Sequence, residues 1–140
     1  MTQDSTSHVS NILRTWFAIH FIADLVFAIP LMIAPVTTLT MVGWSPDAVD
    51  PLSTRLVGSA LMGIGIESLL GRNANDHVYL AMLNLKSIWS LSATVGILLS
   101  LLEWGDQAPW GGWMFFGIFL SFSTVWNLYR IKLKVALSVE

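Results

Sequence analysis

Four long runs of apolar residues, separated by short polar segments, dominate the pattern of this chain. They cover about residues 12–34, 51–70, 77–102 and 110–129. A helix of about 20 apolar residues, rising about 1.5 Å per residue, is long enough to cross the hydrocarbon core of a bilayer. The pattern therefore predicts an all-α fold, a four-span transmembrane helix bundle whose consecutive helices run up, down, up and down.

Residues that favour helix ends mark the same boundaries. Pro30 and Pro35 predict a kink or a stop near the end of the first run. The chain divides into a polar tail at 1–11, one helical domain at 12–130 and a basic tail at 131–140. The expected N-caps are Ser10 or Asn11, Asp50, and Asn75 or Asp76, and the expected C-cap of the second run is Gly71.

Composition supports a bilayer as the solvent of this chain. Apolar residues make up 54% and charged residues only 11%, so too few polar side chains are present to cover a water-soluble domain. The net charge of -2 offers no basic face for nucleic acid, which we exclude as a partner. The lipid bilayer is the expected partner, with a homo-oligomer or a larger membrane complex as a further possibility.

Two independent signals predict how the spans are oriented. Lysine and arginine flank one side only, at positions 14, 72, 130, 132 and 134, which by the positive-inside rule places both termini and the hairpin at 71–76 in the cytoplasm. Aromatic residues are expected at both interfaces. Those of the outer side are Trp44, Trp104, Trp110 and Trp113, and those of the inner side are Trp16, Tyr79, Trp126 and Tyr129.

Two charged residues lie deep in the predicted spans. At about 1.5 Å per residue, Asp24 lies about 15 Å from the inner end of the first span, and Lys86 lies a similar distance into the third. Buried charges face the bundle interior, a partner or a water pocket. The matched depth predicts a direct Asp24–Lys86 ion pair that sets helix packing. A pair that carries protons or substrate, or a separate partner for each residue, are the alternatives.

His20 and Asp24 are four residues apart and share one face of the first helix. A carboxylate at this spacing orients the imidazole, or the two residues are ligands of a metal with Glu67 as the third. We favour a hydrogen-bonded histidine, because specific metal-binding motifs are absent, and we predict no metal and no cofactor. The candidates for binding or proton coupling are His20, Asp24, Glu67, Asn84 and Lys86.

The second apolar run carries a charge near each end and small residues between them. Arg55 is about one turn inside the outer end, where its side chain is expected to reach headgroups or loop carboxylates. Glu67 is about one turn from the inner end, where Arg72, Lys86 or His20 is the expected partner. Ser59 and Gly63 have the small-xxx-small spacing that lets another helix approach closely. The residues predicted to pack helices together are Gly58, Ser59, Gly63 and Gly65.

The segment TRLVGSALMGIGIESLLGR, which follows a first span and a GW-x-P linker, resembles small four-helix membrane proteins of bacteria and archaea whose function is uncharacterised. The resemblance implies a multi-pass protein of the inner (plasma) membrane and brings no activity with it. Sequence motifs of phosphate loops, dinucleotide sites, nucleophile elbows and metalloproteases are absent, so an enzyme is disfavoured.

Three functions remain as hypotheses from the sequence. The first is a small accessory, scaffold or binding subunit whose buried charges, Asp24 and Lys86, set helix packing. The second is a homo-oligomeric transporter or channel that couples protons or a small ligand through Asp24, Glu67 and His20. The third is an intramembrane metalloprotein or lipid-modifying enzyme.

Overall fold

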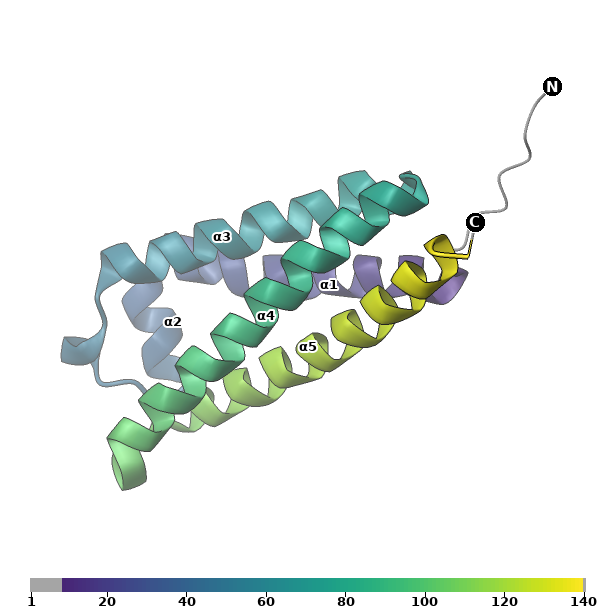
Figure 1. The fold of residues 1–140 in the computed structure, drawn as a ribbon. Coiled ribbons are helices and arrows are strands. Elements are labelled where there is room, and N and C mark those ends of the chain that lie inside the picture. The colour runs from purple at the N-terminus through teal and green to yellow at the C-terminus, as the bar shows by residue number, and fades with distance from the viewer. Residues whose placement is uncertain (1–8, 140) are drawn as a thin grey trace.

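The computed structural model describes residues 9–139, and this part of the chain is all-α, as the sequence predicts. Four long helices follow one another in antiparallel order, with short helices in the connections (Figure 1). The elements are α1 (Asn11–Ile33), α2 (Pro35–Met41), η1 (Pro46–Ala48), α3 (Pro51–Leu70), η2 (Gly71–Asn73), α4 (Asp76–Trp104), η3 (Gly105–Gln107) and α5 (Trp110–Leu137).

The helices begin where capping residues predict. In three of the long helices the N-cap side chain accepts a hydrogen bond from a backbone amide of the first turn, which satisfies a donor that has no partner within the helix. The caps are Ser10 for α1, Asp50 for α3 and Asn75 for α4. α1 continues through Pro30 to Ile33, and Pro35 opens the short helix α2 within the segment expected to be a linker.

The predicted tails differ from the structure. Residues 1–8 of the expected polar tail lie outside the described residues, and Val9 is buried in the core. At the other end, α5 does not stop near Tyr129 but continues to Leu137. Leu133 and Leu137 are one turn apart on the same helix face and pack against the core, which keeps the predicted basic tail helical.

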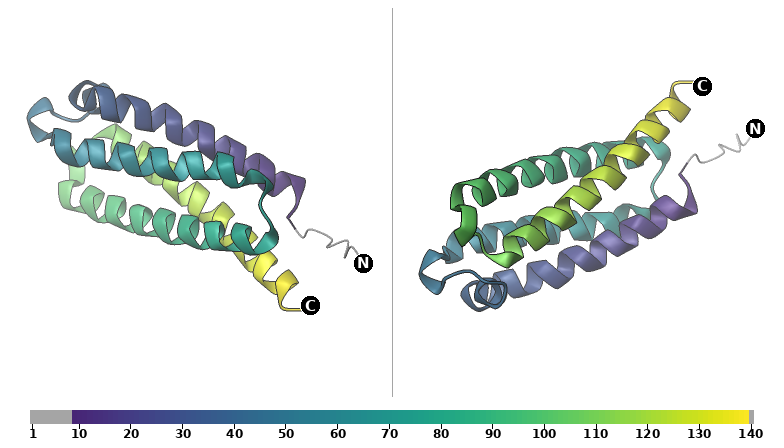
Figure 2. Two further views of the ribbon diagram at one scale, coloured as in Figure 1. Left: turned by 90° about the horizontal axis from the view of Figure 1, so that it is seen from above. Right: turned by 90° about the horizontal axis from the view of Figure 1, so that it is seen from below.

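The bundle consists of two closely packed helix pairs. α1 packs against α3, and α4 packs against α5. The pairs converge at η2 and at the two ends of the described chain, which we call the inner end, and α3 and α4 diverge towards the outer end, which holds η1 and η3 (Figure 1). α5 crosses the other helices obliquely (Figure 2).

Large apolar side chains fill the inner half of the space between the pairs. The main cluster there includes Phe17, Tyr79, Leu83 and Trp126, all fully buried. Tyr79 and Trp126 therefore lie in the core rather than at the inner interface where the sequence pattern places them. The outer-end residues Trp104, Trp110 and Trp113 are exposed as expected.

The outward faces of the bundle are apolar, and its interior contains several polar side chains beside the apolar core. Each long helix exposes large aliphatic side chains, while one lysine, one aspartate, one histidine and several hydroxyl side chains are buried between the helices. The buried polar residues are His20, Asp24, Thr54, Ser68, Lys86, Ser87, Ser90, Thr94 and Ser123. By length and composition, α1 and the segment Asp76–Gln107 are apolar enough to cross a membrane, and the described part of the chain holds two such helices.

Candidate functional site

The first feature of the site is a histidine–aspartate dyad on α1. His20 and Asp24 lie one helical turn apart, and the His20 Nδ1 atom is 2.9 Å from the Asp24 Oδ2 atom. Both residues are buried. Neither of these two atoms has a hydrogen-bond partner of good geometry among the described residues, so the contact is one of proximity. The four-residue spacing correctly predicts that the two side chains meet on one helix face.

Aromatic rings of α5 hold the imidazole from the other side. The ring centroids of Phe122 and Trp126 lie 4.7 Å and 5.1 Å from that of His20, both in edge-to-face geometry. Edge-to-face contacts favour a defined ring orientation. His20 is thus positioned by Asp24 on its own helix and by two rings on α5.

A glycine on α3 makes room for the aspartate. A Cβ atom on Gly65 would lie 2.8 Å from the Cβ atom of Asp24, closer than real Cβ atoms approach other groups. Gly58 faces α1 in the same way, because a Cβ there would lie 2.9 Å from the Met32 Cγ atom. Gly65 and Gly58 therefore set the close approach of α1 and α3.

Of the other two small residues of α3, Ser59 also reaches α1 and Gly63 does not. The Ser59 hydroxyl lies 3.8 Å from the Met32 Sδ atom of α1 and donates to the Arg55 carbonyl of its own helix at 2.9 Å, whereas Gly63 has open space where a Cβ would be. The two glycines that face α1 are seven residues apart, at Gly58 and Gly65, and Gly63 of the predicted Ser59–Gly63 pair is not among them. A small-xxx-small pattern shows which residues share a helix face but does not show which face meets a partner.

The second feature is a lysine that contacts all the long helices. Lys86 of α4 is 1% exposed. Its Nζ atom donates to the Ser68 Oγ atom of α3 at 2.6 Å and lies 3.5 Å from the Glu67 Oε2 atom. The ammonium also lies over the rings of Phe17 on α1, at 5.1 Å, and Trp126 on α5, at 5.8 Å. Lys86 thereby ties the two helix pairs together.

The direct Asp24–Lys86 pair predicted from matched depth is replaced by two other pairs. Asp24 pairs with His20, and Lys86 pairs with Glu67. Depth along the helices places the two charges at the same level but does not fix the direction of each side chain, and the Lys86 ammonium turns towards α3. Asp24 still attracts Lys86 through space, so the four side chains form one electrostatic cluster.

The remaining predicted polar residues form links near the ends of the bundle. Asn84 accepts a hydrogen bond from the Arg130 Nε atom at 2.5 Å and so joins α4 to α5. Arg55 donates from Nε to the Met32 carbonyl at 3.1 Å, which places a cation at the C-terminal end of α1, where the helix dipole favours it. The expected contact of Arg55 with loop carboxylates is replaced by this bond.

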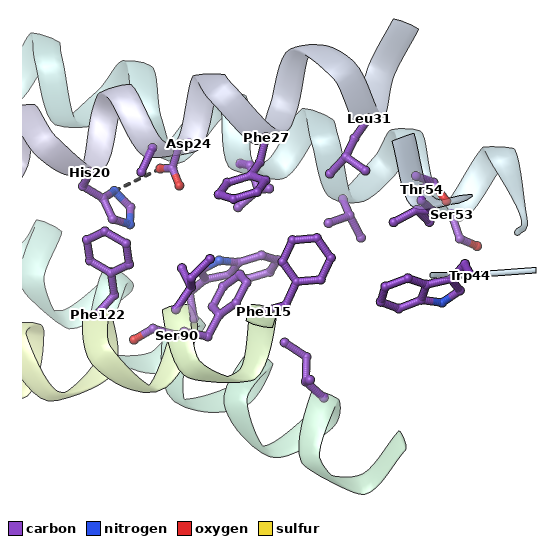
Figure 3. A pocket seen from close by; sticks show the side chains of 18 residues that line it. His20, Asp24, Phe27, Leu31, Trp44, Ser53, Thr54, Ser90, Phe115 and Phe122 are labelled. Carbon is purple, nitrogen blue, oxygen red and sulfur yellow. Dashed lines mark ion pairs between the residues drawn. The ribbon is translucent and has the colours of Figure 1, made fainter. Parts of the chain in front are cut away.

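The third feature is an internal cavity of about 310 Å³ between the two helix pairs (Figure 3). His20 and Asp24 lie at one end of it, and Trp44 lies at the other. Its walls are mostly aromatic and aliphatic, with Phe27, Phe115 and Leu61 among them. The sequence pattern gives no sign of this cavity, because it arises from the divergence of α3 and α4.

Few polar side chains line this cavity. Besides the dyad they are Ser53 and Thr54 of α3 and Ser90 of α4. The Thr54 hydroxyl donates to the Asp50 carbonyl at 2.7 Å, and the Ser90 hydroxyl donates to the Lys86 carbonyl at 2.7 Å. These hydroxyl hydrogens are therefore used within the protein. A mostly apolar cavity with a few placed polar groups has the usual composition of a small-molecule site.

Within residues 9–139, no group of three or more histidine, aspartate and glutamate side chains is arranged so that it could hold a metal ion. Glu67, the third ligand considered from the sequence, is paired with Lys86 instead. Comparisons with protein-family models, with curated proteins and with solved structures give no match for this chain.

Proposed function

We propose that this chain is a four-span membrane protein that binds a small, largely apolar molecule in its internal cavity. Its inside-out arrangement supports the membrane part of the proposal. The long helices present Ile, Leu and Val side chains outwards while Asp24 and Lys86 are buried between them, an arrangement unlike that of a water-soluble bundle. A lipid environment gives such an outer surface a favourable solvent.

α3 and α5 are less apolar than α1 and α4, but the polar residues that they carry are compatible with insertion into a membrane. The two charges of α3 have partners inside the bundle, since Arg55 bonds to α1 and Glu67 pairs with Lys86. α5 begins with tryptophan and glycine residues, and tryptophan favours the membrane interface. In the proposed orientation the inner end faces the cytoplasm, because the positive charges that flank it follow the positive-inside rule.

The cavity is the observation that carries the binding proposal. Its volume of about 310 Å³ falls within the range of small-molecule sites, roughly 300–1,000 Å³. An apolar cavity of about 150 Å³ already binds benzene, so a two-ring aromatic molecule or a short aliphatic one is a suitable size here. Of the hypotheses drawn from the sequence, the geometry favours the binding subunit.

The cavity opens sideways between α3 and α4. Ser53 and Val57 both line the cavity and are exposed, and Val57 is 46% exposed. We call this exposed edge of the cavity, lined by Ser53 and Val57 of α3 and Ile97 of α4, the lateral opening. In the proposed orientation it faces lipid in the outer half of the membrane, so the ligand would come from the bilayer.

Binding of naphthalene to the protein in lipid nanodiscs tests this function. Isothermal titration calorimetry, corrected with empty nanodiscs, is expected to show saturable binding at one site per chain. Ile97→Trp places a large ring in the cavity wall and should abolish this binding. Val95→Trp is the matched control, because Val95 is 50% exposed on the same helix and does not line the cavity. Equal binding by both variants would contradict the proposal.

A second candidate, proton-coupled transport, is favoured by the cluster of His20, Asp24, Glu67 and Lys86. These ionisable side chains lie near one another between the helices, and the first two line the cavity. Such clusters inside membrane helices serve as proton relays. A pH-driven flux in liposomes that is lost in Asp24→Asn would establish this role, and flux that is unchanged by the substitution would exclude it.

A further inference from the structure

The cavity is lined by all four long helices and is bounded by two seams between the helix pairs. Because α1 packs against α3, and α4 against α5, one seam lies between α3 and α4 and the other between α1 and α5. The first seam carries the lateral opening. At the second seam, side chains of α5 stand between the cavity and the surface of the bundle. Whether the cavity has one entrance or two depends on these side chains.

A groove runs along the surface of the second seam. Trp16 of α1 lines this α1–α5 groove together with residues of α5, of which Trp113, Gly117 and Ser121 are exposed. Gly117 has open space where a Cβ would be. The Ser121 hydroxyl donates to the Gly117 carbonyl of its own helix at 2.7 Å, so this side chain stays close to α5. In the proposed membrane position the groove faces lipid.

The cavity and the α1–α5 groove have a wall in common. Ile118 and Phe122 line both of them. The two residues are four apart and therefore lie one above the other on the same face of α5. The cavity is thus separated from the groove by side chains of one helix face, and a change in the position of a single side chain is enough to connect them.

Phe122 is the member of this wall that lies at the inner end of the cavity, beside His20 (Figure 3). Its ring lies edge to face with those of His20 and Trp16, with centroids 4.7 Å and 6.4 Å apart, and is stacked on that of Trp126 at 5.8 Å. A phenyl ring has no hydrogen bond to break when it turns, and Phe122 is only half-buried. The open space at Gly117 lies in the groove on the same helix.

We propose that Phe122 is a gate between the cavity and the α1–α5 groove, which is closed in this structure, and that movement of its ring opens a second route to lipid. The inference rests on the proposed binding function and adds a path to it. A ligand that enters at the lateral opening then leaves on the opposite side of the bundle, between α1 and α5, without passing through water.

Phe122→Ala tests the gate, with Phe119→Ala as the matched control. Both substitutions remove a phenyl ring from the cavity wall, but Phe119 does not line the groove. Stopped-flow fluorescence of naphthalene in nanodiscs is expected to show association and dissociation several-fold faster than in the wild type for Phe122→Ala only. Equal rates in the two variants would overturn the gate, and the binding function would still stand if calorimetry shows saturable binding by the wild type. Absence of that binding would overturn both.

A block in the groove tests the route itself. Gly117→Trp, combined with Phe122→Ala, places a ring in the groove and should return both rates to the wild-type values. Gly96→Trp in the same background is the control, because Gly96 of α4 also has open space where a Cβ would be and lines neither the cavity nor the groove. Rates that stay high in both combinations would overturn the route. Ile118→Ala opens the same wall with a smaller loss of packing and should also accelerate exchange.

Discussion

Gly65 of α3 lies directly against Asp24 of α1, and the two leave no room for a further carbon atom between them. The absent side chain lets the Asp24 carboxylate stay between α1 and α3 while it orients His20. This relationship joins helix packing to the geometry of the candidate site, because any atom added at Gly65 displaces Asp24.

Gly65→Ala is therefore expected to destabilise the bundle and to disturb the dyad together. Overpacking at such a contact typically costs about 1–3 kcal/mol of unfolding free energy. Unfolding in detergent measures the loss. Gly63→Ala is the matched control on the same helix, and since its new methyl group meets no atom, it should be neutral or stabilising by about 0.5–1 kcal/mol. Equal effects of the two substitutions would show that α1 and α3 are not closely packed at Gly65.

Lys86 and Glu67 should show a larger energetic coupling than Lys86 and Asp24. The ammonium lies 3.5 Å from the Glu67 carboxylate, whereas Asp24 is paired with His20. Double-mutant cycles with Lys86→Met, Glu67→Gln and Asp24→Asn measure both couplings. Residues in one network couple by about 0.5–3 kcal/mol, and we expect the Lys86–Glu67 value in this range and the Lys86–Asp24 value below it. The reverse order would favour the direct pair predicted from helix depth.

A larger side chain at the lateral opening should slow the access of ligand. Val57→Trp adds a ring at the exposed edge of the cavity, so the association rate of naphthalene should fall, as measured by stopped-flow fluorescence in nanodiscs. Leu56→Trp is the control, because Leu56 is its neighbour, is 62% exposed and does not line the cavity. Equal rates in the two variants would place the access route elsewhere.

The absence of native cysteine makes the proposed topology directly testable. Single cysteines at Asp47 in η1 and Asp106 in η3 should react with a membrane-impermeant maleimide in intact cells. A cysteine at Asn73 in η2 should react only after the membrane is permeabilised. Labelling of all three positions in intact cells would contradict the four-span arrangement.

Asp50 should make the start of α3 sensitive to acid. Hydrogen bonds from the Ser53 side chain and from the Ser53 and Leu52 amides lower the pKa of Asp50 below its ordinary value of 3.8. The unfolded chain therefore takes up the proton first, so this stabilisation is complete above about pH 5 and is lost as the pH falls through the lower folded pKa. Thermal unfolding at about pH 5 and pH 3 measures the loss. Asp50→Asn, which keeps an acceptor without the charge, should show a smaller decrease.

Local signals predicted the helices better than the site. Ser10, Asp50 and Asn75 are recognisable caps because each acts on amides a few residues away in its own helix. The His20–Asp24 contact was accessible for the same reason, since both residues lie on one helix. Contacts between residues of the same helix can therefore be predicted from their spacing in the sequence.

Contacts between helices depend on the direction in which each side chain points, and the spacing of residues along the sequence does not give that direction. Lys86 reaches Ser68 and Glu67 because α4 is rotated to face α3, and no sequence pattern fixes that rotation. Trp126 looked like an interfacial residue, but its ring packs against His20 and Phe17 in the interior. The cavity depends on the angle at which whole helices diverge, so its aromatic lining could not be foreseen.

The sideways position of the lateral opening changes which concentration governs occupancy of the cavity. A site that is reached through lipid responds to the amount of ligand dissolved in the membrane, which for an apolar molecule greatly exceeds that in water. Modest intrinsic affinity then suffices for saturation. Ligands would be selected in two stages, first by partition into the bilayer and then by fit to the cavity, so strongly water-soluble molecules would be excluded at the first stage.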